Sequence, residues 1–507
     1  MSVKNTHSDY REMLQTWKRC RDAAEGQSAV HAAGAEYLPM LADQSAKEYD
    51  AYKMRASFYN ATWRTISGLQ GMLFRKPPVV KVAAVVEPLL EDVNLEGESL
   101  HMFTLELLEE CLTVGRVGIF VDYPTIDPIH TTLADSRRMG LRPTMKKYCT
   151  ESIINWRKSV INNANVLSLV VLAEEVEAIG DTEFDTGETT QYRVLDLSKL
   201  KKPDGSEELV YRVRVFLVGK DGKDDLQSTS YPMVKGAYMT FIPFYVVGTD
   251  CVDIDPDEPP LVDLVDINLS HYRTNADYEH GCHFTGLPTP VISGYTPEKE
   301  GQSFSIGSMT AWVFPRPDAK ASYLEFTGQG LKALESNLER KEKQMVVLGA
   351  RMLESKSATG DSQGGAAIHM GGEQSLLASI AQAASIGIER ALNTFSKFAG
   401  TAEEAKFALN KDFFPMPMSA LTLTALVASW QNGAINYETL FANLKKGEVI
   451  DIDQTIEKEL EKMDLHKPEI PAGTKVNQDN TGGHETTLPG SSGNNPTQRQ
   501  LQTPPKA

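Results

Sequence analysis

The sequence predicts an α+β protein, and three observations lead to this prediction. Apolar residues recur three or four positions apart in several long stretches, which is typical of helices that bury one face. Between about Val166 and Val247 the pattern changes to strand-length apolar runs separated by turn residues. Hydrophobic residues make up 41% of the 507 residues and charged residues 23%, which is ordinary globular usage and excludes a wholly disordered or multi-pass membrane chain.

The length and the charge limit what the chain can do. At about 100–200 residues per domain there is room for roughly three or four domains, or for one elaborated body. The chain has 51 Lys and Arg residues against 68 Asp and Glu residues, which gives a net charge of −17. This charge argues against binding nucleic acid by bulk attraction, but it allows a protein past which DNA slides without being held.

The cysteines and the N-terminus indicate a reducing compartment. There are 5 cysteines, odd in number and far apart, which predicts reduced thiols rather than a disulfide scaffold. The first residues are polar, and no apolar run reaches about 18 residues, so we expect neither a secretory signal nor a transmembrane helix.

Helical spacing and proline mark the elements of the N-terminal part. Apolar residues predict a first helix over residues 10–20 and a longer one from about Ser45 to Phe74. Pro77-Pro78 ends the longer helix, because proline lacks an N–H and disfavours helix in the residue before it. A third helix over 98–112 leads into the apolar run Val114–Val121, which indicates a buried strand.

Strand signals fill the next part of the chain. The expected strands are Val166–Leu172, Gln191–Leu197, Leu209–Val218 and Tyr238–Val247. Pro203-Asp204-Gly205 is a turn signal between the second and third of them and predicts a hairpin, and Asp221-Gly222 marks a further turn. The acidic run Asp253–Pro260 ends the strand pattern.

Helices return after residue 260. The expected helices are Leu261–Phe284, Gly330–Leu353, Glu373–Phe398, Ser419–Trp430 and Asn436–Gly447. Short strands are expected at 291–292, 310–314 and 406–414. The Ser- and Gly-rich stretch 355–372 indicates a mobile loop. The tail after Pro468 has too few apolar residues to offset its ordering entropy, so we expect it to be disordered.

The search for catalytic motifs finds none. The glycine-rich stretch Gly364–Gly372 lacks the Lys-Ser/Thr pair of a phosphate-binding loop, so an ATP motor is not expected. Two acidic runs resemble Ca²⁺ loops, but Glu258 replaces the turn glycine of one and Tyr192 replaces the bidentate glutamate of the other. The carboxylates are too numerous for a catalytic pair to be chosen, and we expect no enzyme and no cofactor.

One cluster has residue types that bind zinc, namely His271, His280, Cys282 and His283. His280 and His283 would share one face of a helix, and zinc needs three or four converging ligands. Cys282 points away from these neighbours on a helix, and no Cys-x-x-Cys pair occurs elsewhere. We therefore favour histidines that pack between helices and no metal, and we keep a metalloenzyme that uses His271, His280 and His283 as the weaker alternative.

The order of the elements and several sequence blocks resemble one known family. The blocks are Tyr49–Pro78, Phe241–Val247, Pro260–His280, Leu287–Gly294 and Tyr323–Leu331. They include an Ile-Pro-Phe strand followed by an acidic and aliphatic entry into a long helix. This pattern resembles the portal proteins, or head-to-tail connectors, of tailed bacteriophages, and the resemblance covers about residues 40–465.

The resemblance implies a portal architecture of wing, stem, clip and crown, with long stem and tunnel helices that assemble into a ring. The implied parts are the wing 1–260, descending stem helix 261–284, clip 285–327, ascending stem helix 328–354, tunnel loop 355–372, tunnel helix 373–398, return to the wing 399–418, crown 419–465 and disordered tail 466–507.

The same resemblance implies roles for particular residues. The candidates for contact with DNA in the channel are Arg351, Lys356, His369 and Gln374. The candidates for the interface between ring subunits are Leu331, Leu334, Leu338, Met345, Leu348, Ala381 and Ala384. The candidates for adaptor or terminase docking on the clip are Trp312, Phe314 and Arg316.

A portal protein would form a ring of about twelve copies at one capsid vertex, through which double-stranded DNA enters and leaves. The implied partners are further copies of the chain, the terminase large subunit, a head-completion or adaptor protein, and the major capsid and scaffold proteins. Contact with DNA would be transient, no membrane would be involved, and the protein would be made in the bacterial cytoplasm and end in the virion.

Deletion of Ala358–Gly365 should leave rings intact while packaging fails. The first alternative is another phage neck or capsid protein that conducts no DNA.

Overall fold

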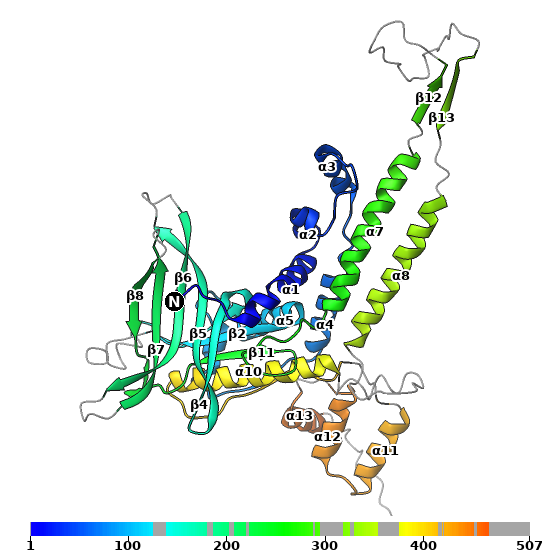
Figure 1. Cartoon of the computed structure of the whole chain (residues 1–507). Helices are drawn as coiled ribbons and strands as arrows, with labels where there is room; N and C mark the ends of the chain where they lie inside the picture. Colours follow the sequence, from blue (N-terminus) through cyan, green and yellow to red (C-terminus); the bar gives the residue numbers. More distant parts are fainter. Residues whose placement is uncertain are drawn as a thin grey trace, which may run out of the picture. The chain divides into compact units, whose positions relative to one another are not determined.

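The structure is a computed structural model that places most of the chain (Figure 1). The residues it describes are 2–124, 138–179, 186–201, 207–219, 223–286, 289–294, 318–324, 329–352, 375–413, 418, 420–450 and 454–465. The chain divides into two units, Met1–Pro415 and Met416–Ala507, and each is described by itself.

The described strands of the first unit pair antiparallel, and with the helices they make an α+β protein, as predicted. The larger sheet has five strands in chain order: β4 (Ile153–Ile161), β5 (Ala164–Ile179), β6 (Thr186–Lys201), β7 (Glu207–Val218) and β8 (Asp224–Ser230). The predicted hairpin is confirmed, because β6 pairs with β7 from Gln191 opposite Leu217 to Lys201 opposite Glu207. The smaller sheet has the order β11 (Phe244–Gly248), β2 (Arg116–Asp122) and β3 (Thr144–Cys149).

A hydrophobic cluster joins the two sheets. Trp156 and Leu172 of the larger sheet pack in the same cluster as Phe120, Tyr148 and Phe244 of the smaller sheet. All five side chains are buried, and full burial of a large apolar side chain stabilises a protein by about 1.5–3 kcal/mol. The two sheets therefore form one body.

The N-terminal residues cross the other face of the larger sheet. The backbone N–H of Val3 donates to the carboxylate of Asp224 at the β8 edge, at 2.9 Å. The ring of His7 stacks on Trp156 in β4, at the opposite edge, with 4.1 Å between the ring centroids. Val3 and Tyr10 cover the small apolar cluster of this face. The chain is therefore tied across the sheet before its first helix begins.

Two helices cover the smaller sheet. The helix α5 (Leu100–Val114) begins at Ser99, whose hydroxyl accepts the N–H of Met102. The helix α10 (Leu376–Phe398) begins at Ser375, whose hydroxyl accepts the N–H of Ala378. The small residues of α10 bring it close to the sheet, and a Cβ on Gly387 would lie only 2.5 Å from a methyl of Val247.

The predicted single helix from Ser45 to Phe74 is wrong. The structure has two helices there, α3 (Ala46–Arg55) and α4 (Ala61–Leu73). Ala56 has an extended backbone, and the side chain of Asn60 starts a new helix by accepting the N–H of Trp63. The predicted helix at residues 10–20 is present as α1 (Ser8–Glu25), and α2 (Gln27–Ala33) follows it without having been predicted.

Two predicted strands are shorter than expected. In place of Tyr238–Val247, β10 (Ala237–Tyr238) pairs with β9 (Met233–Val234), and β11 starts only at Phe244. Pro243 lies between them and has no N–H to give to a sheet. In place of 406–414, β14 (Lys406–Ala408) pairs with β1 (Val79–Lys81), and the side chain of Asn410 then accepts the N–H of Asp412 in a turn.

Three short 3₁₀ turns link these elements: η1 (Gly34–Glu36), η2 (Glu87–Glu91) and η3 (Thr150–Ser152).

The second unit contains α11 (Ala420–Gln431) and α12 (Tyr437–Lys446), as predicted, and also α13 (Ile456–Leu465), which was not predicted. Its described part buries only two large apolar side chains, Leu440 and Phe441. All five cysteine thiols of the chain are unpaired. Among the described helices, none has the length and apolar character needed to cross a membrane.

Gly115 joins α5 to β2 in a conformation that requires glycine. Its φ is 81°, and a Cβ would lie 3.1–3.2 Å from backbone atoms of Asp257, Glu258 and Pro259. We expect Gly115→Ala to lower the free energy of unfolding by about 1–3 kcal/mol, because neither the backbone angle nor the neighbouring backbone can relax. Gly71→Ala is the matched control, since no atom lies within 4 Å of a Cβ there. The control should raise stability by about 0.5–1 kcal/mol in denaturant unfolding. Equal midpoints for the two variants would contradict the prediction.

Candidate assembly surface on the α7–α8 helix pair

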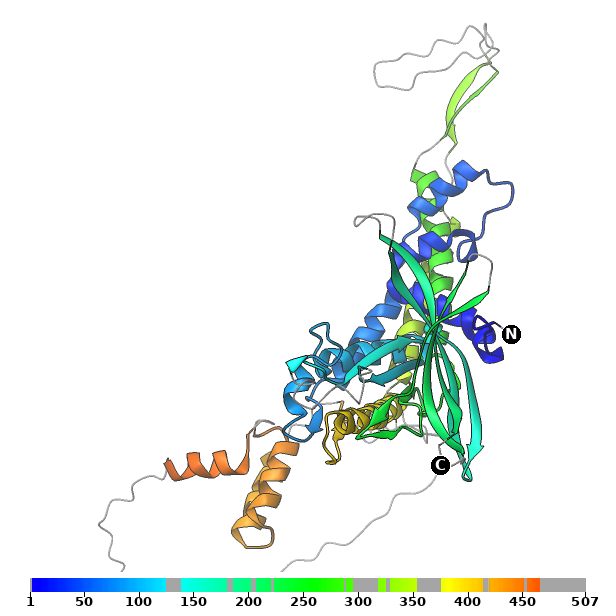
Figure 2. The same ribbon diagram turned by 90° about the vertical axis from the view of Figure 1, so that its left-hand side faces the viewer.

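The helices α7 (Val262–Gly286) and α8 (Gln329–Arg351) form an antiparallel pair, and both were predicted. Gly281 faces Leu331 near one end of the pair, and Gly349 faces Leu264 near the other. The 25 residues of α7 span about 38 Å at the helical rise of 1.5 Å. Beyond the ends of the pair, away from the sheets, β12 (Thr289–Ser293) and β13 (Lys320–Leu324) form a hairpin (Figures 1 and 2).

The N-terminal helices support α7 on the side that α8 leaves open (Figure 2). The hydroxyl of Tyr52 in α3 donates to Asp277 at 2.7 Å. The side-chain oxygen of Asn268 accepts the N–H and the hydroxyl of Thr62 in α4, at 3.1 and 2.9 Å. Val265, Leu269, Tyr272 and Ala276 bury their side chains in one cluster with residues of α1, α2 and α3. The helix α7 is therefore held on two sides, whereas α8 keeps an exposed face.

The structure places the predicted ring-interface residues mainly inside the chain. Leu338 and Met345 of α8 are buried, and so are Ala381 and Ala384 of α10. Leu331, Leu334 and Leu348 are half-buried. The heptad seam of α8 packs on α7 of the same chain, where Leu331 lies against Gly281 and Lys341 bonds to Ser270 and Thr274. The four buried side chains thus offer no surface to a neighbouring copy, which corrects the prediction for them.

A lysine lies within this seam. Lys341 is only 9% exposed, and its ammonium donates to the carbonyl of Ser270 at 2.8 Å and to the hydroxyl of Thr274 at 2.5 Å. Burial lowers the pKa of Lys341 below its ordinary value, and the nearby positive charges of Arg273 and Arg340 lower it further. The seam therefore holds a cation without a carboxylate hydrogen-bonded to it in the described part of the pair.

The histidines of the proposed zinc cluster pack separately. His271 is buried beside Tyr59, with its Nε2 3.5 Å from a carboxylate oxygen of Glu342, and burial lowers its pKa. His280 lies edge-on to Tyr52 and within 3.2 Å of the Arg55 guanidinium. Within the described residues, no three His, Cys, Asp or Glu side chains are grouped as metal ligands would be. His271 and His280 thus pack against aromatic residues of the N-terminal part of the chain, whereas His283 contacts Phe284 of its own helix, with 5.5 Å between the ring centroids.

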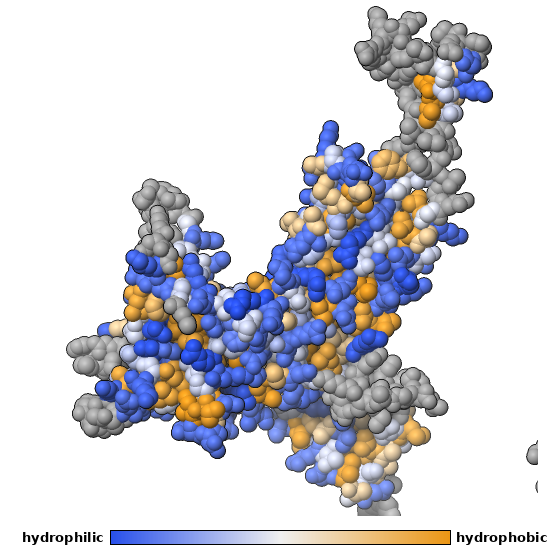
Figure 3. Space-filling view, viewed as in Figure 1, coloured by the Kyte–Doolittle hydropathy of each residue, from blue (hydrophilic) through white to orange (hydrophobic). Residues whose placement is uncertain are grey.

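The exposed side of the pair carries a groove between α7 and α8. It has a volume of about 570 Å³ and is lined by Asp263, Asp266 and Ile267 of α7 and by Arg340, Lys343, Gln344, Val347, Leu348 and Arg351 of α8. Figure 3 shows apolar residues interspersed with polar ones along this pair. Val347 is 52% exposed, although it is a β-branched aliphatic residue. An exposed apolar strip with charged borders is typical of a surface that binds another protein.

The sequence analysis missed this groove, although part of its signal is visible. Arg340, Gln344, Val347 and Arg351 recur at i, i+4, i+7 and i+11, which is one face of a helix. The opposite wall of the groove is formed by Asp263, Asp266 and Ile267 of α7, some eighty positions earlier in the sequence. Only the antiparallel pairing of α7 with α8 brings these residues next to the α8 face. Of the predicted DNA contacts, Arg351 lines the groove and is exposed. The other candidates, Lys356, His369 and Gln374 for DNA and Trp312, Phe314 and Arg316 for docking, lie outside the described residues.

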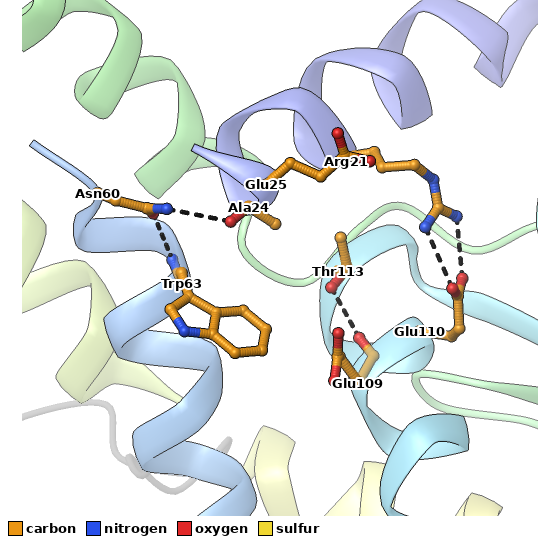
Figure 4. Close-up of a pocket in the computed structure, with 8 residues that line it drawn as sticks. All are labelled: Arg21, Ala24, Glu25, Asn60, Trp63, Glu109, Glu110 and Thr113. Carbon is orange, nitrogen blue, oxygen red and sulfur yellow. Dashed lines mark hydrogen bonds and ion pairs between the residues drawn. The ribbon is translucent and has the colours of Figure 1, made fainter. Parts of the chain in front are cut away.

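A second hollow, between α1, α4 and α5, is part of the scaffold (Figure 4). Its volume is about 340 Å³. Arg21 donates to both carboxylate oxygens of Glu110 at 3.1 and 2.9 Å and to those of Glu151 at 2.8 Å. Asn60 donates to the carbonyl of Ala24 and caps α4. These contacts join α1, α4 and α5, so the residues around the hollow hold the three helices together.

Comparison with known proteins gives three kinds of result. A family described as a domain of unknown function (DUF4055) matches residues 260–399, the stretch that contains α7, α8 and α10. No curated protein sequence matches the chain significantly. Among solved structures, the chain is similar to chains of gene transfer agent (GTA) particles.

Three of these structures show the extent of the similarity. A chain of the neck of an empty GTA particle, computed with C6 symmetry, is 10% identical with a TM-score of 0.35, over 76% of this chain and 89% of that one. A chain of the virion of the native particle is 10% identical with a TM-score of 0.37, over 82% and 96%. A chain of the neck of the native particle, computed with C12 symmetry, is 10% identical with a TM-score of 0.34, over 77% and 91%.

Proposed function

We propose that this chain is a portal protein, a ring-forming component at one vertex of a tailed-phage capsid. The observation that carries the proposal is the order of elements in the first unit. A β-rich body leads into α7, a terminal hairpin, the returning α8 and then α10, which is buried in the body. This order agrees with the blocks that resemble portal proteins in the sequence.

The geometry of the α7–α8 pair suits a ring subunit. A ring of identical copies needs a surface on each side of the subunit, so that each copy contacts two neighbours. The pair has a supported side, where α1 to α4 pack on α7, and an exposed side with the groove. The isolated two-stranded hairpin β12–β13 is marginal alone in water, and contact with a partner would stabilise it.

In this proposal each part of a portal corresponds to a segment of the chain. The sheets and the helices around them form the wing, α7 and α8 the stem, and the hairpin belongs to the clip 285–327. The segment 355–372 is the tunnel loop, α10 the tunnel helix, and α11 to α13 the crown. Arg351, Lys356, His369 and Gln374 are proposed to meet DNA phosphates, and Trp312, Phe314 and Arg316 to meet the terminase large subunit and later a head-completion or adaptor protein.

The charge of the chain fits a channel that conducts DNA without holding it. Every phosphate contact made by Lys or Arg adds affinity, and many such contacts would slow movement. With a net charge of −17, the ring repels DNA over most of its surface and leaves only transient contacts. ATP hydrolysis is assigned to the terminase partner, and the chain itself has no turnover. It is made in the host cytoplasm, meets capsid and scaffold proteins there, and remains in the virion.

Cryo-electron microscopy of the purified chain, with particle mass measured in parallel, tests the proposal. We expect closed rings of about twelve copies with a bore of about 20 Å or more, wide enough for a duplex. Rings with a narrower bore would instead favour a neck or capsid component that conducts no DNA. A chain that stays monomeric at every concentration, also with capsid scaffold present, would contradict the proposal.

A further inference from the structure

The exposed face of α8 carries two flanks of opposite charge. The acidic flank consists of Glu335, Glu339 and Glu342, and the basic flank consists of Arg340, Lys343 and Arg351. All six residues are exposed. A single helix therefore presents negative charge on one side and positive charge on another.

The spacing of the residues sets the angle between the flanks. Glu335, Glu339 and Glu342 follow the i, i+4, i+7 pattern of one stripe, and Arg340 and Arg351 lie on a second stripe. The five positions from Glu335 to Arg340 turn the helix by about 140° at 3.6 residues per turn. Lys343 lies between the two stripes, one turn after Glu339 and about 80° from Glu335, so it is Arg340 and Arg351 that point away from the acidic flank and toward a different neighbour.

Each flank also carries an exposed valine. Val346 follows Glu339 by seven positions and is 73% exposed, and Val347 follows Arg340 by seven positions and is 52% exposed. On the basic side, Val347 and the half-buried Leu348 lie in the groove of about 570 Å³. The acidic side presents Val346 as a projecting apolar group of a size that the groove can receive.

Most of these charges are not used within the chain. In the described part, Glu335, Glu339, Lys343 and Arg351 form no ion pair. Arg340 donates to Asn337 at 2.8 Å, and Glu342 lies 3.5 Å from His271. On the α7 wall of the groove, Asp266 is already paired with Arg19 at 3.1 Å. The other carboxylate of that wall, Asp263, lines the groove without an ion pair to Arg340, Lys343 or Arg351 among the described residues, so these cations are available to carboxylates from outside.

We propose that the acidic flank of α8 in one copy docks on the basic flank of α8 in the next copy, with Val346 entering the neighbour's groove beside Val347. The partner that binds each flank is a second copy of this chain, because the chain carries both the acidic flank and the basic flank that complements it. A two-fold contact would place like charges opposite each other on either flank, which is unfavourable, so the contact is head-to-tail. The inference rests on the proposed ring and identifies the surface that joins its subunits.

Charge reversal on α8 tests this contact in the full-length chain. E335K/E339K makes both flanks basic, and R340E/K343E makes both acidic. We expect the apparent dissociation constant for assembly of each variant alone to rise roughly ten-fold or more, because like charges then face each other. An equimolar mixture of the two variants should assemble again. The fourfold swap E335K/E339K/R340E/K343E keeps the net charge and should assemble like the wild type.

The controls separate the flanks from bulk charge and from folding. E87K/E91K makes the same charge change as E335K/E339K on the exposed turn η2 and should assemble normally. Circular dichroism and melting temperature should match the wild type for all variants, since the altered side chains are exposed. Sedimentation velocity at several salt concentrations gives the readout, and wild-type assembly should weaken as salt rises.

The outcomes distinguish this inference from the proposed function. If the wild type forms rings and the single-flank variants assemble equally well, or the fourfold swap assembles no better than they do, the docking mode is overturned and the portal proposal stands. If E87K/E91K weakens assembly as much as E335K/E339K does, net charge rather than the α8 flanks controls assembly and the docking mode is again overturned. If the wild type stays monomeric at every concentration, also with capsid scaffold present, both are overturned.

Discussion

Arg116→Met should lower the free energy of unfolding by about 3–5 kcal/mol, the largest loss that we expect from one substitution in this chain. Arg116 is 0% exposed, and its guanidinium donates to the hydroxyl and carbonyl of Thr150 and to the carbonyls of Ile153 and Ile254, at 2.8–3.4 Å. Methionine can fill much of the space but donates no hydrogen bond, so these buried carbonyls would lose their partner.

The position of Arg116 explains why its loss should affect the whole body. Its guanidinium lies 5.2 Å from the ring centroid of Trp17 in α1 and 4.6 Å from that of Trp156 in β4. Burial lowers its pKa to about 10, which still leaves it charged at neutral pH. The residue thus joins the N-terminal helix, both sheets and the acidic loop before α7 through one side chain.

Denaturant unfolding followed by tryptophan fluorescence measures this effect directly, because Trp17 and Trp156 flank the altered site. Arg157→Met is the matched control, since Arg157 is the neighbour of Trp156 in β4 and is exposed. The control should change stability by less than about 0.5 kcal/mol. A loss for Arg116→Met no larger than that of the control would show that the hydrogen bonds of Arg116 contribute little.

Lys341→Met should have the opposite effect on stability to Arg116→Met. We expect it to raise the free energy of unfolding by about 1–2 kcal/mol. Both acceptors of Lys341 keep a partner without it, because the hydroxyl of Thr274 donates to the carbonyl of Ser270 within α7 at 3.2 Å. The ammonium is desolvated without a carboxylate hydrogen-bonded to it, and methionine has a similar length and suits an apolar seam.

The pH dependence gives a second readout of the same substitution. The pKa of Lys341 is lower in the folded chain than its ordinary value of 10.5, so the unfolded chain binds more protons between the two values. Wild-type stability relative to the variant should therefore rise as the pH increases through the folded pKa toward 10.5. The advantage of Lys341→Met should shrink over this window.

Lys332→Met, on the exposed face of α8, is the control for Lys341→Met and should not raise the free energy of unfolding. Thermal unfolding at a series of pH values measures the gain in stability and its pH dependence. A clear loss of stability for Lys341→Met at neutral pH would mean that the buried ammonium contributes more through its hydrogen bonds than it costs in desolvation.

Periodicity predicted the long helices well and the breaks between elements poorly. The helices α7, α8 and α10, of 25, 23 and 23 residues, were found because apolar residues recur at helical spacing along much of each. The break between α3 and α4 was missed because Tyr59 and Trp63 continue the apolar spacing. In the structure they are 57% and 39% exposed, and the local capping by Asn60 decides the break. Capping acts through one side chain and leaves little trace in an apolar pattern.

The candidate site was predictable only in part, for a related reason. The seam of α8 was visible as a heptad, but the sequence could not say whether α7 of the same chain or a neighbouring copy would cover Leu338 and Met345. The exposed stripes Glu335–Glu342 and Arg340–Arg351 were equally visible. They could be interpreted as a docking surface only once the buried face of α8 was known. A charged stripe on an isolated helix usually faces solvent.

The support of α7 by the N-terminal helices has a consequence during synthesis. Tyr52 in α3 finds its hydrogen-bond partner Asp277 at a separation of 225 residues. At about 5–20 residues per second, the ribosome needs roughly 11–45 seconds to make that stretch. During this time the buried faces of α1, α2 and α3 have no α7 to pack against, and exposed apolar surface of this kind promotes aggregation. Nascent chains that end before residue 277 should therefore bind chaperones, and this binding should fall sharply once α7 has emerged.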